Sequence, residues 1–235
     1  MIKKQRKPVT MKLSMMALAL AAAAAISAPA HAARSDSQIW TNGAVNVKLG
    51  NGWRLQEETT ARFSDHRNGL YEFESNTLLG YQLNKVVTLW AGYTHNPQYS
   101  GGDFTVTEHR AREQATFDGF VKVGAGKLNG RLRLEERWRN NVEGTGWRVR
   151  PYLKYSLPIG GKTALNLSTE PFLNLNTTPF QKQSGLDRVR NLITVSTPLT
   201  KSMSGELGYM NQHGFVRGGP DTSDNIAYFG LALSL

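Results

Sequence analysis

Hydrophobic and polar residues alternate along most of the chain after residue 33. Between residues 127 and 139, for example, Arg131, Arg133 and Glu135 alternate with Leu132 and Leu134. Successive side chains of a β-strand point to opposite faces of the sheet, so this period of two predicts strands. Eleven segments show the pattern, namely 39–49, 53–64, 69–83, 86–95, 108–123, 127–139, 147–157, 163–175, 185–199, 203–213 and 224–235.

The lengths of these segments and of their connections predict a membrane barrel. Most segments reach the roughly 9–11 residues with which a tilted strand crosses a bilayer. Short connections such as 50–52 and 83–85 alternate with long ones at 96–107 and 176–184, a habit of outer-membrane barrels. The predicted fold class is therefore all-β, an antiparallel transmembrane β-barrel of ten to twelve strands.

A soluble β-sandwich is the alternative, with its apolar face inside and its polar face in water. Three features favour the barrel, whose apolar face meets lipid. The polar face is rich in Arg and Glu, the final strand 224–235 is apolar on one face, and aromatic residues lie near both ends of the predicted strands. These aromatic residues are Trp53, Tyr81 and Tyr155 beside short turns, and Tyr71, Tyr93, Trp138, Trp147 and Tyr209 beside long loops.

The strand number stays open between ten and twelve, because single-chain bacterial barrels have even numbers of strands. The second to eleventh segments form a consistent ten-strand barrel. The first segment, 39–49, then either pairs with an unrecognised twelfth strand or lies outside the barrel.

Three acidic residues and two prolines conflict locally with a regular barrel. Glu57, Glu113 and Glu136 fall on the predicted lipid face, and we expect local bulges to turn them inward. Pro151 and Pro171 lack the amide proton that a strand ladder needs, so they should interrupt it.

The first 32 residues have the organisation of a cleavable signal peptide. An apolar run from Leu13 to Ile26 is followed by the cleavage pattern Ala30-His31-Ala32. Met11 is an alternative start that would shorten the signal. The domain organisation is thus a signal peptide at 1–32 and a barrel at 33–235. The basic residues that precede the apolar run are Lys3, Lys4, Arg6, Lys7 and Lys12.

Removal of the signal changes the interpretation of the charge. It removes five of the 28 basic residues and no acidic one, so the formal charge falls from +10 to +5. Because the chain is exported, we expect no nucleic-acid partner. The absence of cysteine excludes disulfides, a thiol nucleophile and a thiolate metal site. We predict no metal and no cofactor.

Export and a barrel together predict the outer membrane of a Gram-negative bacterium, with its lipid and lipopolysaccharide as partners. The end of the chain, Tyr228–Leu235, resembles the C-terminal signal that the barrel-assembly machinery reads. The usual last residue of that signal is Phe, and Leu235 departs from it.

The chain contains the motifs Glu108-His109-Arg110 with Gln114, Arg131–Arg137, Arg148-Val149-Arg150, Glu170-Pro171-Phe172, Arg188-Val189-Arg190, and Glu206–Tyr209 with Gln212. Together, in this order, they resemble the outer-membrane family known only as domain of unknown function 2490. The resemblance covers nearly the whole mature chain, and it implies a barrel with an Arg/Glu interior but no established activity. Where a His is often expected near the last strand, Asp224 and Asn225 stand instead.

The charged residues of the polar face are the candidate functional residues, and Arg clearly exceeds Lys among them. Guanidinium groups pair with carboxylates through two parallel hydrogen bonds and stay charged when partly buried. Glu72 and Glu74 lie on the same face. The predicted network consists of Arg54, Glu58, Arg62, Glu108, Arg110, Arg112, Arg131, Arg133, Glu135, Arg137, Arg139, Arg148, Arg150, Glu170, Arg188, Arg190 and Glu206.

Three functions fit this face. The favoured one is a structural or narrow-pore barrel filled by salt bridges. The second is an anion-selective channel for acidic small molecules or oligosaccharides, because basic residues outnumber acidic ones. The third is a lipid-modifying enzyme that uses a histidine at the outer rim, where His66, His95, His109 and His213 all fall. No spacing identifies a catalytic triad, so we assign no catalytic residue.

Overall fold

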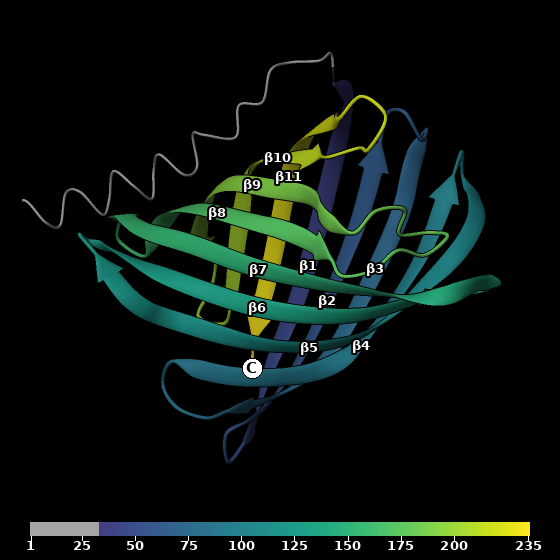
Figure 1. Ribbon diagram of the computed structural model, residues 1–235. Coiled ribbons are helices and arrows are strands. Elements are labelled where there is room, and N and C mark those ends of the chain that lie inside the picture. Colours follow the sequence, from purple (N-terminus) through teal and green to yellow (C-terminus); the bar gives the residue numbers. More distant parts are fainter. Residues whose placement is uncertain (1–32) are drawn as a thin grey trace, which may run out of the picture. The chain divides into compact units, whose positions relative to one another are not determined.

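Eleven strands pair edge to edge around a closed barrel in the computed structural model, which describes residues 33–235 (Figure 1). The predicted signal peptide lies outside the described residues. The strands are β1 (Arg34–Gly50), β2 (Trp53–Ser64), β3 (Gly69–Gln82), β4 (Val87–Ser100), β5 (Asp103–Val123), β6 (Gly126–Arg139), β7 (Val142–Gly160), β8 (Thr163–Asn174), β9 (Gly185–Pro198), β10 (Met203–Gly214) and β11 (Thr222–Ser234).

The described part of the chain has no helix that is long and apolar enough to cross a membrane.

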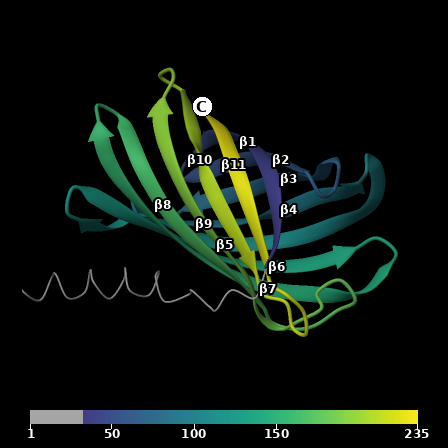
Figure 2. The ribbon, with the colours of Figure 1, turned by 90° about the horizontal axis from the view of Figure 1, so that it is seen from above.

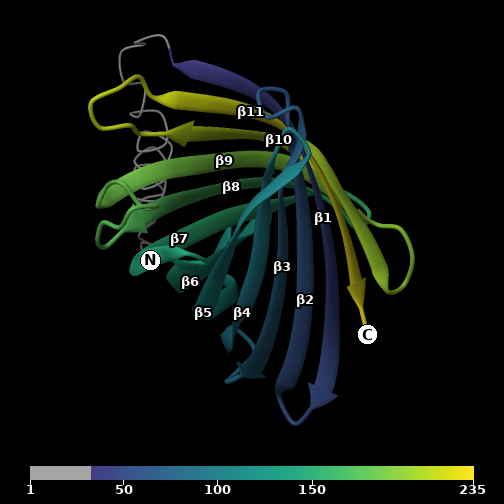
Figure 3. The ribbon, with the colours of Figure 1, turned by 90° about the vertical axis from the view of Figure 1, so that its right-hand side faces the viewer.

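The barrel closes through its first and last strands. Consecutive strands are antiparallel, whereas β1 runs parallel to β11 from the pair Arg34–Thr222 to the pair Asn46–Ser234 (Figures 2 and 3). The fold class is confirmed, but the expectation of an even strand number is wrong. The segment 39–49 neither needs a twelfth strand nor lies outside. In an odd series of up-and-down strands the first and last run the same way, and their parallel pairing leaves no sheet edge unpaired.

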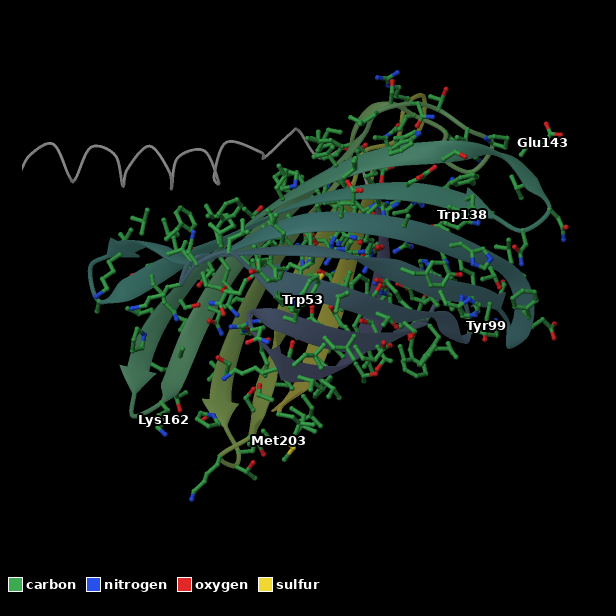
Figure 4. The ribbon with its side chains drawn as sticks, turned by 90° about the horizontal axis from the view of Figure 1, so that it is seen from below. Trp53, Tyr99, Trp138, Glu143, Lys162 and Met203 are labelled. Atoms are coloured by element: carbon green, nitrogen blue, oxygen red, sulfur yellow. The ribbon has the colours of Figure 1, made fainter. Side chains whose placement is uncertain are left out.

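The two ends of the barrel differ in their connections. Lys162 and Met203 lie at the end with the C-terminus, which we call the short-turn end (Figure 4). Tyr99 and Glu143 lie at the opposite end, which we call the long-loop end and which includes residues 175–184 and 215–221.

The predicted long loop at 96–107 is wrong. There β4 and β5 continue almost to Gly101 and Gly102, whose φ angles of 62° and 91° form a tight hairpin turn.

The barrel is apolar outside and polar inside. Leu132, Leu167 and Ile193 are 52%, 46% and 44% exposed on the outer face. The buried residues are mostly polar or charged, and the largest buried apolar cluster within 33–235 consists of Trp40, Met210 and Ile226. This single closed barrel excludes the two packed sheets of a soluble sandwich.

The outer face carries most of the predicted aromatic residues. Trp53 and Tyr81 meet edge to edge at 5.1 Å between ring centroids, and both are exposed. Tyr71 is the exception, because it is 6% exposed and points inward. It is the extra residue of a β-bulge: Arg62 pairs with Glu72 while Phe63 pairs with Leu70.

The three acidic residues of the outer face stay there. The strand register is continuous around Glu57, Glu113 and Glu136, so no bulge turns them inward and that expectation is wrong. Glu57 accepts hydrogen bonds on the outer face from the hydroxyls of Ser75 and Thr77, at 2.7 and 2.5 Å.

The two prolines interrupt the ladder between β7 and β8 as expected. Pairing passes from Val149–Leu173 directly to Leu153–Thr169. Pro151 and Pro171 occupy equivalent positions in this gap, and neither can donate a main-chain hydrogen bond.

Candidate functional site in the barrel lumen

The charged residues of β5, β6 and β7 line the lumen because alternation sends every second side chain inward. Register then places the rows side by side, since Arg112 pairs with Glu135 and Glu135 pairs with Arg148. Carboxylates thereby lie between arginines that would otherwise repel one another.

Glu135 is the centre of this arrangement, and its side chain has no exposed surface. One carboxylate oxygen lies 2.8 Å from Arg150 Nη1 and 3.1 Å from Arg112 Nε. The other accepts hydrogen bonds from Arg148 Nη2 at 2.5 Å and Nε at 2.8 Å. Arg133 Nη1 is more distant, at 3.9 Å.

Glu108 forms a second centre nearer the long-loop end. It is completely buried and accepts hydrogen bonds from Arg110 Nε at 2.7 Å, Arg137 Nη2 at 2.9 Å and Arg139 Nε at 2.9 Å. Three guanidinium groups therefore surround one carboxylate that has no exposed surface, although the side chain of Arg139 is itself 23% exposed.

Glu74 of β3 joins the two centres. It lies 3.0 Å from Arg62 and Arg110 and 2.7 Å from Arg112. Arg110 also contacts Glu108, and Arg112 also contacts Glu135. The pairs thus form a continuous assembly rather than separate bridges.

Glu170 extends the assembly to β8 through ion pairs with Arg131 and Arg150, and Glu72 extends it at β3 through Arg62. We call the whole the charge network. It contains five glutamates, Glu72, Glu74, Glu108, Glu135 and Glu170, and nine arginines, Arg62, Arg110, Arg112, Arg131, Arg133, Arg137, Arg139, Arg148 and Arg150.

Five predicted residues lie in the lumen but outside the charge network. Arg54 donates to Gln82, and Glu58 accepts from Asn42 at 3.1 Å. Arg188 pairs with its neighbour Asp187 at 2.7 Å, and Arg190 donates to Gln212 at 2.8 Å. Glu206 lies 3.8 Å from Lys154.

Two aromatic residues that the sequence analysis did not place in the lumen stack on the arginines. The Trp40 ring lies between Arg62 and Arg190, at 4.4 and 4.6 Å from their Cζ atoms. The Phe172 ring lies 4.2 Å from Arg150 and 4.5 Å from Arg190. Cation–π contacts of this kind stabilise arginines, and among these three only Arg190 has no carboxylate of residues 33–235 within salt-bridge distance. The sequence pattern that could have identified each ring is a single aromatic residue among the polar residues of an inward strand face.

The loop of residues 175–184 covers part of the charge network at the long-loop end. Gln181 is 3% exposed, and its side-chain oxygen accepts a hydrogen bond from Arg137 at 2.8 Å. Phe180 lies 5.0 Å from the guanidinium of Arg139. The loop residues therefore fold onto the lumen, which alternation within the strands could not predict.

The short-turn end contains a cavity of about 360 Å³ that we call the inner cavity. It lies between β1 and β2 on one side and β4, β5 and β6 on the other. Arg54, Arg131 and Arg133 contribute to its wall, and so do Gln114 and Trp90. The inner cavity therefore adjoins the charge network within the lumen, and Arg131 and Arg133 belong to both.

The histidines make few contacts that suggest chemistry. His95 and His109 pair on adjacent strands with ring centroids 5.7 Å apart. His109 bonds Tyr93 and Asn140, while His213 lies 3.1 Å from Asp221. Within residues 33–235 no group of three or more His, Asp or Glu side chains is placed to hold a metal ion.

Comparison with known proteins finds similarity to a curated relative and to a solved structure. An uncharacterized protein of Methylorubrum extorquens is 27% identical over 184 residues, which cover 75% of this chain and 78% of the relative. An anion-selective porin from Comamonas acidovorans has 14% identity and a TM-score of 0.36, over 78% of this chain and 53% of that one. The chain thus spans about half the length of that porin.

The family assignment comes from the sequence itself. Residues 37–224, which include nearly all of the barrel and every residue of the charge network, match one family. The chain therefore belongs to the family described as protein of unknown function (DUF2490).

Proposed function

We propose that this chain is an outer-membrane barrel whose lumen is closed by the charge network, with a structural role rather than that of an open channel or an enzyme. The observation that carries the proposal is the complete burial of ionic side chains inside the barrel. Arg112 is 1% exposed, and Glu108 and Glu135 have no exposed surface.

Closure follows from the energetics of these groups. A solute that crossed the lumen would have to separate guanidinium–carboxylate pairs at 2.5–3.1 Å and leave their charges unpaired. Removal of one member of a buried pair costs about 3–5 kcal/mol. Thermal motion therefore does not open such a network readily.

The outer face supports placement in a lipid bilayer. Its apolar side chains would meet lipid acyl chains, and its exposed aromatic residues would lie at the interfaces. The proposal includes export through residues 1–32, contact with outer-membrane lipid and lipopolysaccharide, and insertion by the barrel-assembly machinery. The segment that would engage this machinery is Tyr228–Leu235, where Phe229 and Leu231 are exposed on the outer face.

An anion-selective channel is the second candidate, and one observation favours it. Nine arginines face five glutamates in the charge network, and Arg190 has no carboxylate of residues 33–235 within salt-bridge distance. The potential inside the barrel should therefore be positive, so an open state would prefer anions.

Single-channel recording of the refolded full-length chain in a planar bilayer tests the proposal. A heat-dependent shift in gel mobility first verifies that the sample is folded. We expect no steady conductance from the folded protein at neutral pH. Steady anion-selective steps under a salt gradient would contradict closure and establish the channel, and acidic sugars would then be tested as blockers.

A further inference from the structure

The inner cavity contains arginines that the charge network leaves without full partners. Arg133 is only 4% exposed, and its Nε donates to Gln114 at 2.8 Å. Its terminal nitrogens form no hydrogen bond with residues 33–235, and the nearest carboxylate, that of Glu135, lies 3.9 Å away. Glu135 already contacts Arg112, Arg148 and Arg150, so it cannot satisfy a fourth guanidinium.

Two further arginines of the wall add to this surplus. Arg54 hydrogen-bonds Gln82 and has no carboxylate partner among the described residues. Arg131 pairs with Glu170, yet its buried Nε has no partner in the described part of the chain. A buried guanidinium without an anionic partner is costly, because desolvation is not offset by ion pairing.

The remaining polar groups of the cavity wall are consistent with the binding of an anion. Gln114 accepts from Arg133 through its oxygen, so its side-chain nitrogen is left as a donor. Lys48 adds a fourth positive charge, against two negative side chains of the wall, Glu58 and Asp118. Glu58 accepts from Asn42 and forms no ion pair within residues 33–235.

We propose that the inner cavity binds a small organic anion through its carboxylate or phosphate group, with Arg133 as the principal contact and Arg54 and Arg131 as secondary contacts. The volume of about 360 Å³ is near the lower end of the range of ligand pockets, which suits a small solute. The terminal nitrogens of a guanidinium match two oxygens of a carboxylate or phosphate. Lys48 belongs to the cavity wall and lies near the end of β1, at the short-turn end of the barrel. The solute would therefore enter the cavity from that end.

Calorimetric titration of the refolded chain in nonionic detergent tests this site with three probes. Succinate represents a carboxylate solute, inorganic phosphate represents a phosphate, and succinamide is the uncharged control of similar shape. We expect succinate or phosphate to bind and succinamide not to bind. The anion that binds more tightly identifies which of the two groups the natural solute carries.

The variants Arg133→Met and Arg217→Met distinguish the loss of a contact in the inner cavity from the general loss of one positive charge. Arg217 lies in an exposed loop outside the inner cavity, and its loss removes the same charge. We expect Arg133→Met to weaken anion binding about ten-fold or more, because a charge-assisted hydrogen bond is lost. Arg217→Met should bind like the wild type.

Equal binding by wild type and Arg133→Met, or no wild-type binding of either anion at millimolar concentration, would overturn the proposal. If Arg133→Met fails to fold, Arg54→Gln decides the question, since Arg54 is outside the charge network. Weaker binding by Arg54→Gln supports the site, and unchanged binding overturns it. The result does not depend on conductance, so failure of this inference is distinguishable from failure of the proposed closure.

Discussion

Replacement of Glu135 by glutamine should lower the free energy of unfolding by about 3–5 kcal/mol. The carboxylate lies within 3.1 Å of Arg112, Arg148 and Arg150, and all of these side chains are buried. Without its negative charge, their guanidinium groups would repel one another where water cannot screen them. Urea unfolding in detergent micelles, followed by heat-dependent gel mobility, measures the change.

The matched control for this substitution is Glu143→Gln. Glu143 is an exposed residue at the long-loop end and forms no ion pair with residues 33–235, so the same chemical change should leave stability within about 0.5 kcal/mol of the wild type. If Glu135→Gln were as stable as Glu143→Gln, the charge network would contribute nothing to the fold. That result would remove the basis for a closed lumen.

Substitution of Gly208 by alanine should destabilise the barrel by about 3 kcal/mol, the upper part of the usual range for overpacking. A Cβ atom at Gly208 would lie 2.0 Å from the main-chain oxygen of Ile193 and 2.7 Å from Thr194 Cα on the adjacent strand. Main-chain atoms cannot move aside as a flexible side chain can, so β9 and β10 would have to separate. The same unfolding measurement applies.

Gly160→Ala provides the control for the loss of glycine itself. A Cβ at Gly160 has no atom within 4 Å, and this glycine does not have a positive φ. We expect Gly160→Ala to match or slightly exceed wild-type stability, because alanine restricts the unfolded chain. Equal effects of the two substitutions would show that the close approach of β9 and β10 is not a constraint on the fold.

Much of the fold is predictable from local alternation. The period of two around Arg131, Arg133 and Glu135 identifies both the strand and its inward face. All eleven segments correspond to strands, although β1, β4, β5 and β7 are longer than predicted because their flanking residues also pair.

Closure of the barrel was not predictable, because it depends on a contact between the two ends of the described chain. No local pattern shows that 39–49 pairs with 224–235, and the parallel geometry contradicts the usual even strand number. The inward turn of Tyr71 has a similar origin. One extra residue in a bulge reverses the side of the sheet that the alternation indicates.

The composition of the candidate site was predictable, but its pairing was not. Alternation gave the charged residues that line the lumen, whereas register and side-chain geometry determine which carboxylate serves which arginine. Arg133 shows the difference, since the sequence presents it like Arg148 and only the structure leaves its terminal nitrogens unpaired. The stacking of Trp40 between Arg62 and Arg190 likewise joins three separate strands.

We propose that the apolar face of this barrel meets lipid, while its charged face lies inside. The five tryptophans allow a direct test. Trp53 and Trp147 are exposed on the outer face, and Trp138 stacks there with His109. Trp40 is 3% exposed inside the barrel, and Trp90 lines the inner cavity.

The measurement is quenching of tryptophan fluorescence by brominated phospholipids, for the wild type and for a variant with Trp53, Trp138 and Trp147 replaced by Phe, both refolded into vesicles. We expect strong quenching of the wild type and little quenching of the variant, whose remaining tryptophans face the lumen. Equal quenching of both proteins, or no quenching of the wild type, would contradict this proposal.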